Sequence, residues 1–382
     1  MVAQRKGAGF PRLAVHGLPS DDSEARAADL VRMGFDTVVV QMEESVVAAA
    51  VAAKLNVFVC TGSFTVRPGP DRELLAVDVY GDRRVWFGSG CPNHPELRER
   101  HIERIKRALA WRGVGGFYLD GIRFASPAPG LKAFLTCFCD DCARQAKAAK
   151  FDFEAMRRDV RAFGELILGR VDGLERLAHP VSLASVLSEM RGVADWLSFR
   201  ARCIESYVAD LSRVVVDLPG RKRLAAYLFT PAFAALVGQR YQRLAPHLDV
   251  VSPMIYRTWG GDSVLNNEID AIASWPEAGT PLDRSRAVRA SLGFCGLEGL
   301  TGVRSLAGLR KPFLPKVVGD QAALAAKASG VGGKLAPIIR LVDDRLPETV
   351  RLVMAAGATG VNFFSYEAGT EAYLQSAAAL AR

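Results

Sequence analysis

The sequence lacks any long apolar segment. Its 382 residues contain no uninterrupted apolar run of about 18 residues, which is the length that a membrane-spanning helix needs. The first residues, MVAQRKGAGFPRLAVHGLP, have a short basic start. They lack the apolar stretch of about 7 to 15 residues and the small-residue cleavage site of an export signal. We therefore expect no membrane partner and a cytoplasmic location.

The sequence also lacks a strong excess of one charge sign. Its 49 Lys and Arg residues against 41 Asp and Glu residues give a net charge of +8. The basic residues alternate with Glu on helical segments such as RERHIERIKRALAWR, which is typical of a solvated helix face. We therefore expect no nucleic-acid partner. With 49% hydrophobic and 24% charged residues, the chain has the composition of an ordinary globular protein.

Motifs for common cofactors are missing as well. The sequence contains no G-x-x-x-x-G-K-[ST] phosphate loop, no H-E-x-x-H zinc motif and no nucleophile elbow. The glycines of GVGGF and GVGGK are not followed by the helix and acidic residue of a dinucleotide site. We therefore expect no cofactor, and we assign no metal to the catalytic site.

The seven cysteines are an odd number in a chain long enough to fold on its hydrophobic core, which favours a reducing compartment. Three of them form the pattern C-x-C-x-x-C at Cys137, Cys139 and Cys142. Three thiolates could hold a structural zinc ion if a fourth ligand came from Cys91, Cys60, Asp140 or a histidine. The alternatives are a helix-starting loop with partly buried thiols, or a disulfide if the protein is exported.

Short β-rich runs alternate with helical patterns along the whole chain, which is typical of βα units around a parallel sheet. The pattern predicts a (β/α)8 TIM barrel, an α/β fold, as a single domain over 1–382 with a long helical insertion after strand 4 at approximately 125–222. Prolines in the sixth and seventh runs are expected at strand ends or bulges. The eight predicted strands are 12–18, 37–42, 56–64, 116–124, 224–231, 250–257, 334–341 and 360–368.

The carboxyl ends of barrel strands are where functional groups gather, because the βα loops converge there. Asp120 is the strongest candidate, since it directly follows the apolar run GFYL and precedes Gly121. Arg123 lies nearby and would influence its acidity. The alternative is that Asp120 caps a loop or only forms an ion pair with Arg123.

The segment around Asp120 also resembles a known family. GVGGFYLDGIRF, together with the upstream CPNHPELRERHI, is similar to the fourth-strand region of glycoside hydrolase-like barrel proteins related to the α-amylase superfamily. FLTCFCDDCARQA, DWLSFRARCIESYVADL, LVGQRYQRLAPHLDVVSPMIYR and GATGVNFFSYE resemble later segments of that group, so the similarity spans roughly residues 12–370. The resemblance implies a sugar-binding cleft and an acidic residue on the fourth strand, here Asp120. The chain departs from amylase-like enzymes in the fifth strand, LAAYLFTP, which contains no Glu.

Glycosidases generally use two carboxylates, about 5 to 5.5 Å apart for retention and about 6.5 to 9.5 Å apart for inversion. Glu367, after the last strand, is our choice for the partner of Asp120. We expect Asp120 to act as nucleophile or base and Glu367 as the acid. The competing interpretation is that it precedes the last helix and is favoured there by the helix dipole. Other candidates for the second carboxylate are Asp343, Asp344, Asp262 and Glu43, of which Asp343 and Asp344 could instead cap a helix.

A sugar site needs hydrogen-bonding groups and aromatic platforms, because sugars present both polar edges and apolar faces. The predicted substrate-binding residues, all near strand ends, are His16, Gln41, Arg123, Tyr256, Arg257, Trp259 and Arg340. Tyr256 and Trp259 could alternatively pack a loop onto the barrel rim. The expected function is cleavage of a glycosidic bond in an oligosaccharide or glycoside. A catalytically silent sugar-binding barrel and a metal-dependent hydrolase are the alternatives.

Overall fold

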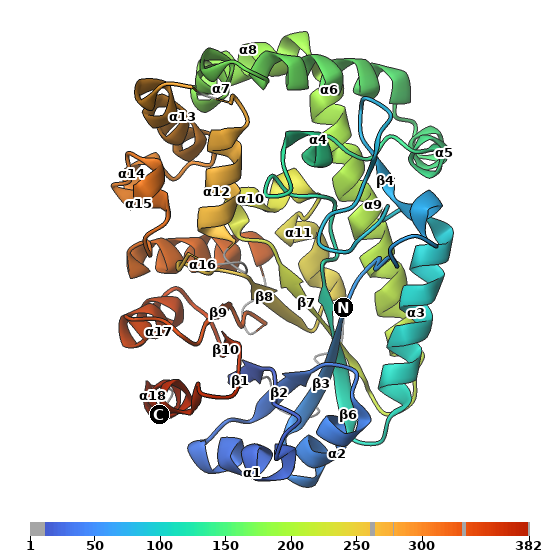
Figure 1. Cartoon of the computed structure of the whole chain (residues 1–382). Helices are drawn as coiled ribbons and strands as arrows, with labels where there is room; N and C mark the ends of the chain where they lie inside the picture. The colour runs from blue at the N-terminus through green and yellow to red at the C-terminus, as the bar shows by residue number, and fades with distance from the viewer. Residues whose placement is uncertain (1–11, 260–263, 278, 331–333, 381–382) are drawn as a thin grey trace.

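The computed structural model describes residues 12–259, 264–277, 279–330 and 334–380. Eight parallel strands form its main sheet, in the order β8-β7-β6-β3-β2-β1-β10-β9. Single parallel bridges from Val251 to Leu335 and from Met254 to Ile338 connect the two outer strands, so the barrel is nearly closed (Figure 1). The predicted (β/α)8 TIM barrel is confirmed. The strands are β1 Leu13–His16, β2 Thr37–Val40, β3 Asn56–Gly62, β6 Val114–Asp120, β7 Arg223–Leu228, β8 Val250–Pro253, β9 Ile338–Arg340 and β10 Val361–Phe364.

The strands are short runs of apolar, often β-branched residues that are covered on both faces. All four residues of β2, TVVV, are buried, as expected for a parallel strand between an inner core and an outer helix layer. Proline limits two strands because it has no N–H to donate. Pro253 is the last residue of β8, and β9 begins directly after Pro337. Both prolines therefore lie at strand ends, as expected.

Helices follow most of the strands and cover the outside of the barrel (Figure 1). Gly34 ends the first of them with φ 99°, a left-handed conformation that glycine adopts without strain. The helices outside the two longest connections are α1 Ser23–Met33, α2 Glu44–Ala52, α3 Pro95–Ala110, α10 Pro231–Ala234, α11 Tyr241–Leu244, α17 Leu346–Ala355 and α18 Glu371–Leu380.

The connection between β6 and β7 is the longest one, and it is helical. Its helix α6 packs against α9, and its helix α7 packs against α13. Figure 1 shows α6, α7 and α8 at the top of the molecule, on the side remote from α1 and α2. The helices are α4 Leu131–Phe134, α5 Asp140–Ala148, α6 Phe153–Ile167, α7 Val171–Ala178, α8 Pro180–Glu189 and α9 Arg191–Val216.

The connection between β3 and α3 contains a 3-10 turn, Arg72–Leu74, and a two-stranded hairpin of β4 (Ala76–Val77) and β5 (Arg83–Arg84). Backbone hydrogen bonds attach this hairpin to the β6–β7 connection. Val79 N donates to Leu135 O at 3.0 Å, and Phe138 N donates to Val77 O at 2.8 Å. Two loops that are distant in sequence therefore form one wall above the barrel.

The β8–β9 connection supplies a further set of helices, of which α12 packs against α13 and α16 packs against α17. They are α12 Leu265–Ser274, α13 Pro281–Phe294, α14 Glu298–Thr301, α15 Leu306–Leu309 and α16 Pro315–Ser329. Among the residues that the structure describes, no helix combines the length and the apolar character that crossing a membrane requires.

Candidate functional site

Asp120 is the last residue of β6, and its side chain faces the inside of the barrel mouth. Tyr118, two residues earlier on the same face of the strand, extends its hydroxyl to Ser252 Oγ of β8 at 3.1 Å. Burial raises the pKa of Asp120, whereas the charge of Arg123 and the Gly121 N–H act in the opposite direction. Gly121 has φ 64°, which lets the chain turn directly after the carboxylate.

Two tyrosines form the floor of the mouth. The rings of Tyr118 and Tyr227 stack with their centroids 4.4 Å apart. The Tyr227 hydroxyl lies 3.0 Å from His16 Nδ1 and accepts a hydrogen bond from Asn362 Nδ2 at 3.1 Å. Burial lowers the pKa of His16 to about 4, so this imidazole is neutral at pH 7. The floor therefore offers uncharged hydrogen-bonding groups from β1, β7 and β10.

Arg123 lies beside Asp120 in an aromatic enclosure. Its guanidinium carbon is 4.5 Å from the ring centroid of Phe229, 4.7 Å from that of Trp86 and 5.5 Å from that of Phe87. Burial lowers the pKa of Arg123 to about 10, and the negative charges of Glu268 and Asp120 oppose that shift. The guanidinium is therefore still protonated at pH 7, held by rings on several sides.

Glu268, on α12, is an acidic residue that we did not predict as part of the site. It is 2% exposed and accepts hydrogen bonds from Ser126 Oγ and the Ala128 N–H, both at 2.8 Å. Burial raises its pKa to about 7, against the effect of Arg123 and the two hydrogen bonds. A signal was available in the sequence, because Glu268 falls on the apolar stripe of Leu265 and Ile272.

Glu367, the predicted partner carboxylate, is exposed on the connection between β10 and α18. Ser365 Oγ donates to its carboxylate, and Thr370 Oγ1 donates to its backbone oxygen at 2.8 Å. In the closed strand order, β6 and β10 are four steps apart among eight strands. Asp120 and Glu367 thus follow strands on opposite sides of the mouth.

Three of the predicted binding residues gather around one ring, that of Phe364 at the end of β10. The ring centroid of Tyr256 is 5.4 Å from that of Phe364, and the His16 ring is 5.3 Å away. The guanidinium of Arg340 lies 5.5 Å from the same ring centroid. Gln41, after β2, is exposed at another part of the rim.

Arg257, another predicted binding residue, is buried and paired with acidic residues of the protein. Its side chain is 2% exposed and forms ion pairs with Asp343 and Asp344. It also donates to Phe313 O at 2.6 Å. The guanidinium of Arg257 is therefore already occupied by protein partners. Asp343 also accepts hydrogen bonds from Arg345 N at 2.7 Å and from Thr349 Oγ1 at 3.1 Å. The N-cap residue of α17 is Arg345, so neither Asp343 nor Asp344 is the helix cap that we considered as their alternative role.

A cavity of about 900 Å³ lies next to the mouth, between the β3–α3 connection, the start of the β6–β7 connection and α12. Phe87 links it to the site, because its ring lies against Arg123 and also lines the cavity. Trp259, predicted as a sugar platform, lines it as well and is 39% exposed. Asp120 is not part of its wall.

Of the remaining candidate acids, Glu43 is the exposed N-cap residue of α2, and Asp262 lies outside the described residues.

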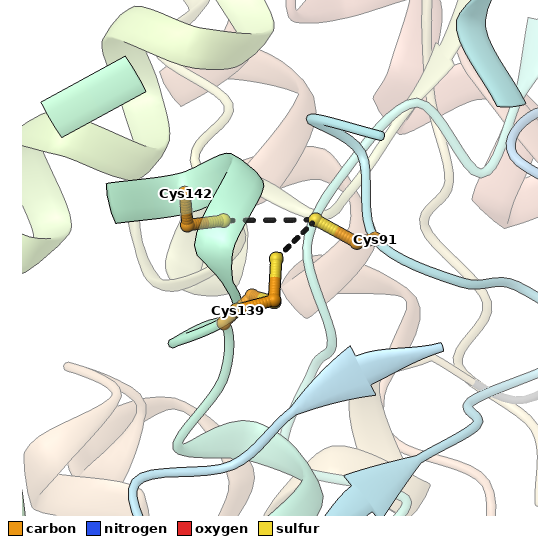
Figure 2. A group of neighbouring side chains, drawn as sticks. Cys91, Cys139 and Cys142 are labelled. Atoms are coloured by element: carbon orange, nitrogen blue, oxygen red, sulfur yellow. Dashed lines mark hydrogen bonds between the residues drawn. The ribbon is translucent and has the colours of Figure 1, made fainter. Parts of the chain in front are cut away.

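The cysteine cluster joins the β3–α3 connection to the β6–β7 connection. The sulfur atoms of Cys91, Cys137, Cys139 and Cys142 all lie within 4.8 Å of one another. Of the possible fourth ligands named from the sequence, the fold brings Cys91 to the other three thiols. Figure 2 shows Cys139 and Cys142, from the β6–β7 connection, pointing toward Cys91 from the β3–α3 connection.

Comparisons with known proteins identify the fold but not a family. No protein-family model matches the sequence, and no curated protein matches it either. The glycoside hydrolase domain of PgaB (BpsB) from Bordetella bronchiseptica is similar in structure, with a TM-score of 0.54 at 12% identity over 98% of each chain. The catalytic domain of β-amylase from Paenibacillus polymyxa matches with a TM-score of 0.52 at 11% identity, over 98% of this chain and 100% of that one.

A catalytic mutant of Gan42B, a GH42 β-galactosidase from G. stearothermophilus, gives a TM-score of 0.55 at 12% identity, over 97% of this chain. The match covers 56% of that β-galactosidase chain, so this protein spans little more than half of its length. At these identities the likeness concerns the fold alone. The chain shares the TIM-barrel fold of these glycoside hydrolase domains.

Proposed function

We propose that this protein cleaves glycosidic bonds at the barrel mouth, with Asp120 as the general acid and Glu367 as the carboxylate that activates water. The observation that carries the proposal is the environment of Asp120. This carboxylate ends β6, faces the barrel interior and has a pKa that burial raises. A carboxylic acid that keeps its proton nearer to neutral pH is suited to protonate a leaving group. We therefore give the acid role to Asp120, which reverses the roles expected from the sequence.

The reaction then runs as a single displacement. Asp120 donates its proton to the glycosidic oxygen while the bond from that oxygen to the anomeric carbon breaks. Water attacks the anomeric carbon from the other face and passes a proton to Glu367. Because the two residues follow strands on opposite sides of the mouth, we favour the wider carboxylate separation and inversion of the anomeric configuration.

The substitution Asp120→Asn tests the proposal. On a panel of glycosides and oligosaccharides, we expect it to lower turnover at least about a hundredfold, because the proton donor is lost. Asp195→Asn, an exposed position on α9, is the matched control and should leave turnover unchanged. Equal turnover in the wild-type and Asp120→Asn proteins on a cleaved substrate would remove Asp120 from the mechanism.

A second candidate function is sugar binding without cleavage. It is favoured by the sequence of β7, RLAAYL, which offers no carboxylate where amylase-like enzymes have a Glu. Calorimetric titration with oligosaccharides, combined with mass spectrometry after long incubation, separates the two functions. Binding without any product would favour the silent barrel, whereas product formation would exclude it.

A further inference from the structure

We propose that four cysteines bind one Zn²⁺ ion, which connects two loops that are distant in sequence but adjacent above the barrel. The four are Cys91, Cys137, Cys139 and Cys142. Cys91 Sγ lies 3.6 Å from Cys142 Sγ and 3.5 Å from Cys139 Sγ (Figure 2). A tetrahedral zinc site with Zn–S bonds of about 2.3 Å places its sulfur atoms about 3.8 Å apart. The thiols are thus already close to the spacing that zinc requires.

The spacing of the four sulfur atoms also distinguishes a single metal ion from a disulfide or an iron–sulfur cluster. A disulfide joins two sulfurs at about 2.05 Å. It would not explain why the other two thiols lie close to them. Here all four sulfurs lie within 4.8 Å of one another. An iron–sulfur cluster would have to fit several iron atoms and bridging sulfides between them. Four thiols around one small space instead match a mononuclear tetrahedral site.

Hydrogen-bond donors surround the sulfurs in the way expected for thiolates. The backbone N–H of Val77 points to Cys137 Sγ, and that of Asn93 points to Cys91 Sγ, both at 3.3 Å. The side-chain amide of Asn93 donates to Cys142 Sγ, also at 3.3 Å. Metal-bound ligands are commonly oriented by such outer hydrogen bonds, which also stabilise negative charge on sulfur.

A buried cation provides a second, independent observation. The side chain of Arg200 is fully buried and donates to Ala125 O at 2.6 Å. Its guanidinium interacts electrostatically with Cys137 and Cys142. Four thiolates around one Zn²⁺ carry a net charge of −2, which would supply the anion that a buried guanidinium needs. Arg200 and the zinc site would therefore stabilise each other.

The position of the site determines its role. Cys91 belongs to the β3–α3 connection, whereas the other three cysteines lie between β6 and β7. The first of these connections also supplies Trp86 and Phe87, whose rings enclose Arg123. Four protein ligands leave zinc no open position for substrate or water, so the ion is structural. It would hold one wall of the cleft and take no part in bond cleavage.

Metal analysis of the full-length protein tests the proposal without any assay of glycoside cleavage. We expect elemental analysis of protein produced with added zinc to find one zinc ion per chain. X-ray absorption should give a shell of four sulfur atoms at about 2.3 Å. Replacement of zinc by Co²⁺ should produce the visible spectrum of a tetrahedral tetrathiolate site.

Variants check which residues bind the metal. Cys139→Ser, at the least buried of the four thiols, should lose most of the bound zinc. Cys295→Ser, at another buried cysteine outside the cluster, should keep it. If Cys139→Ser fails to fold, the sulfur shell of the wild-type protein still decides the question. Iron in place of zinc, metal-free protein, or pairs of these cysteines joined as disulfides in alkylation experiments would each overturn the proposal.

Discussion

The carboxylate of Glu268 accepts a hydrogen bond from the backbone N–H of Ala128 at 2.8 Å, although the two residues are 140 positions apart in the sequence. This contact joins α12 to the loop that follows β6. The same loop contains Arg123, whose charge acts on both Glu268 and Asp120. A buried acid on one helix therefore helps to fix the loop that directly follows the candidate catalytic carboxylate.

The first prediction concerns the effect of pH on stability through Glu268. Its pKa is about 7 in the folded protein, against an ordinary value of 4.5. Between these values the folded state holds a proton that the unfolded state has lost, so the free energy of unfolding falls as pH rises. In Glu268→Gln, an uncharged amide can still form hydrogen bonds, but it does not ionise as the carboxyl group does. At pH 8 we expect this variant to be more stable than wild type by up to about 3 kcal/mol.

Chemical denaturation at several pH values measures this difference. The advantage of Glu268→Gln should shrink between pH 7 and pH 5, because wild-type Glu268 becomes protonated there. Glu99→Gln, at an exposed position on α3, is the control and should follow the wild-type curve. A difference between Glu268→Gln and wild type that stays constant from pH 5 to pH 8 would contradict the prediction.

The sequence was sufficient to predict the barrel because the relevant signals are local. Each strand is a short apolar run between helical patterns, and Pro253 and Pro337 mark strand ends through their missing N–H groups. Asp120 was also identifiable, because an acid directly after the apolar run GFYL must lie at a strand end. Its place at the mouth follows from the barrel fold.

The pairings within the site could not be predicted, because they join residues that the fold brings together from distant positions. Cys91 was one of several possible fourth ligands for the cysteine cluster, and only the packing of two loops selects it. Arg257 and Asp343 were both predicted near strand ends. Their ion pair, however, depends on how the loops after β8 and β9 pack against each other. Glu268 was missed because its partners, Ser126 and Ala128, lie on another connection.

The second prediction concerns that ion pair. The side chains of Arg257 and Asp343 are 2% and 1% exposed, so removing the negative charge of Asp343 leaves a guanidinium poorly compensated in the interior. We expect Asp343→Asn to lower the free energy of unfolding by about 3 kcal/mol. Asp344 binds the same guanidinium but is 65% exposed. Asp344→Asn, the matched control, should cost less than about 1 kcal/mol in denaturant unfolding. Equal losses in the two variants would refute a buried ion pair as the dominant interaction.

The third prediction concerns Phe87, a large apolar residue that is 63% exposed. Its backbone has φ 45°, a conformation that side chains with a Cβ seldom adopt. An exposed aromatic ring in a strained position at the edge of a cavity is typical of a binding residue. If the proposed glycosidase function holds, Phe87→Ala should weaken oligosaccharide binding about tenfold, because a sugar face loses its platform, while stability changes little.

Calorimetric titration and thermal unfolding together separate a binding role of Phe87 from a structural one. Phe87→Trp keeps an aromatic surface and should restore the affinity. Val85→Ala removes apolar surface from the same cavity wall at a side chain that is 53% exposed, so it should bind oligosaccharide as the wild type does. If Val85→Ala and Phe87→Ala weakened binding equally, the cavity would act through its general apolar surface. An unchanged affinity in Phe87→Ala would instead place the sugar elsewhere in the barrel mouth, for example against the rings of Tyr256 and Phe364.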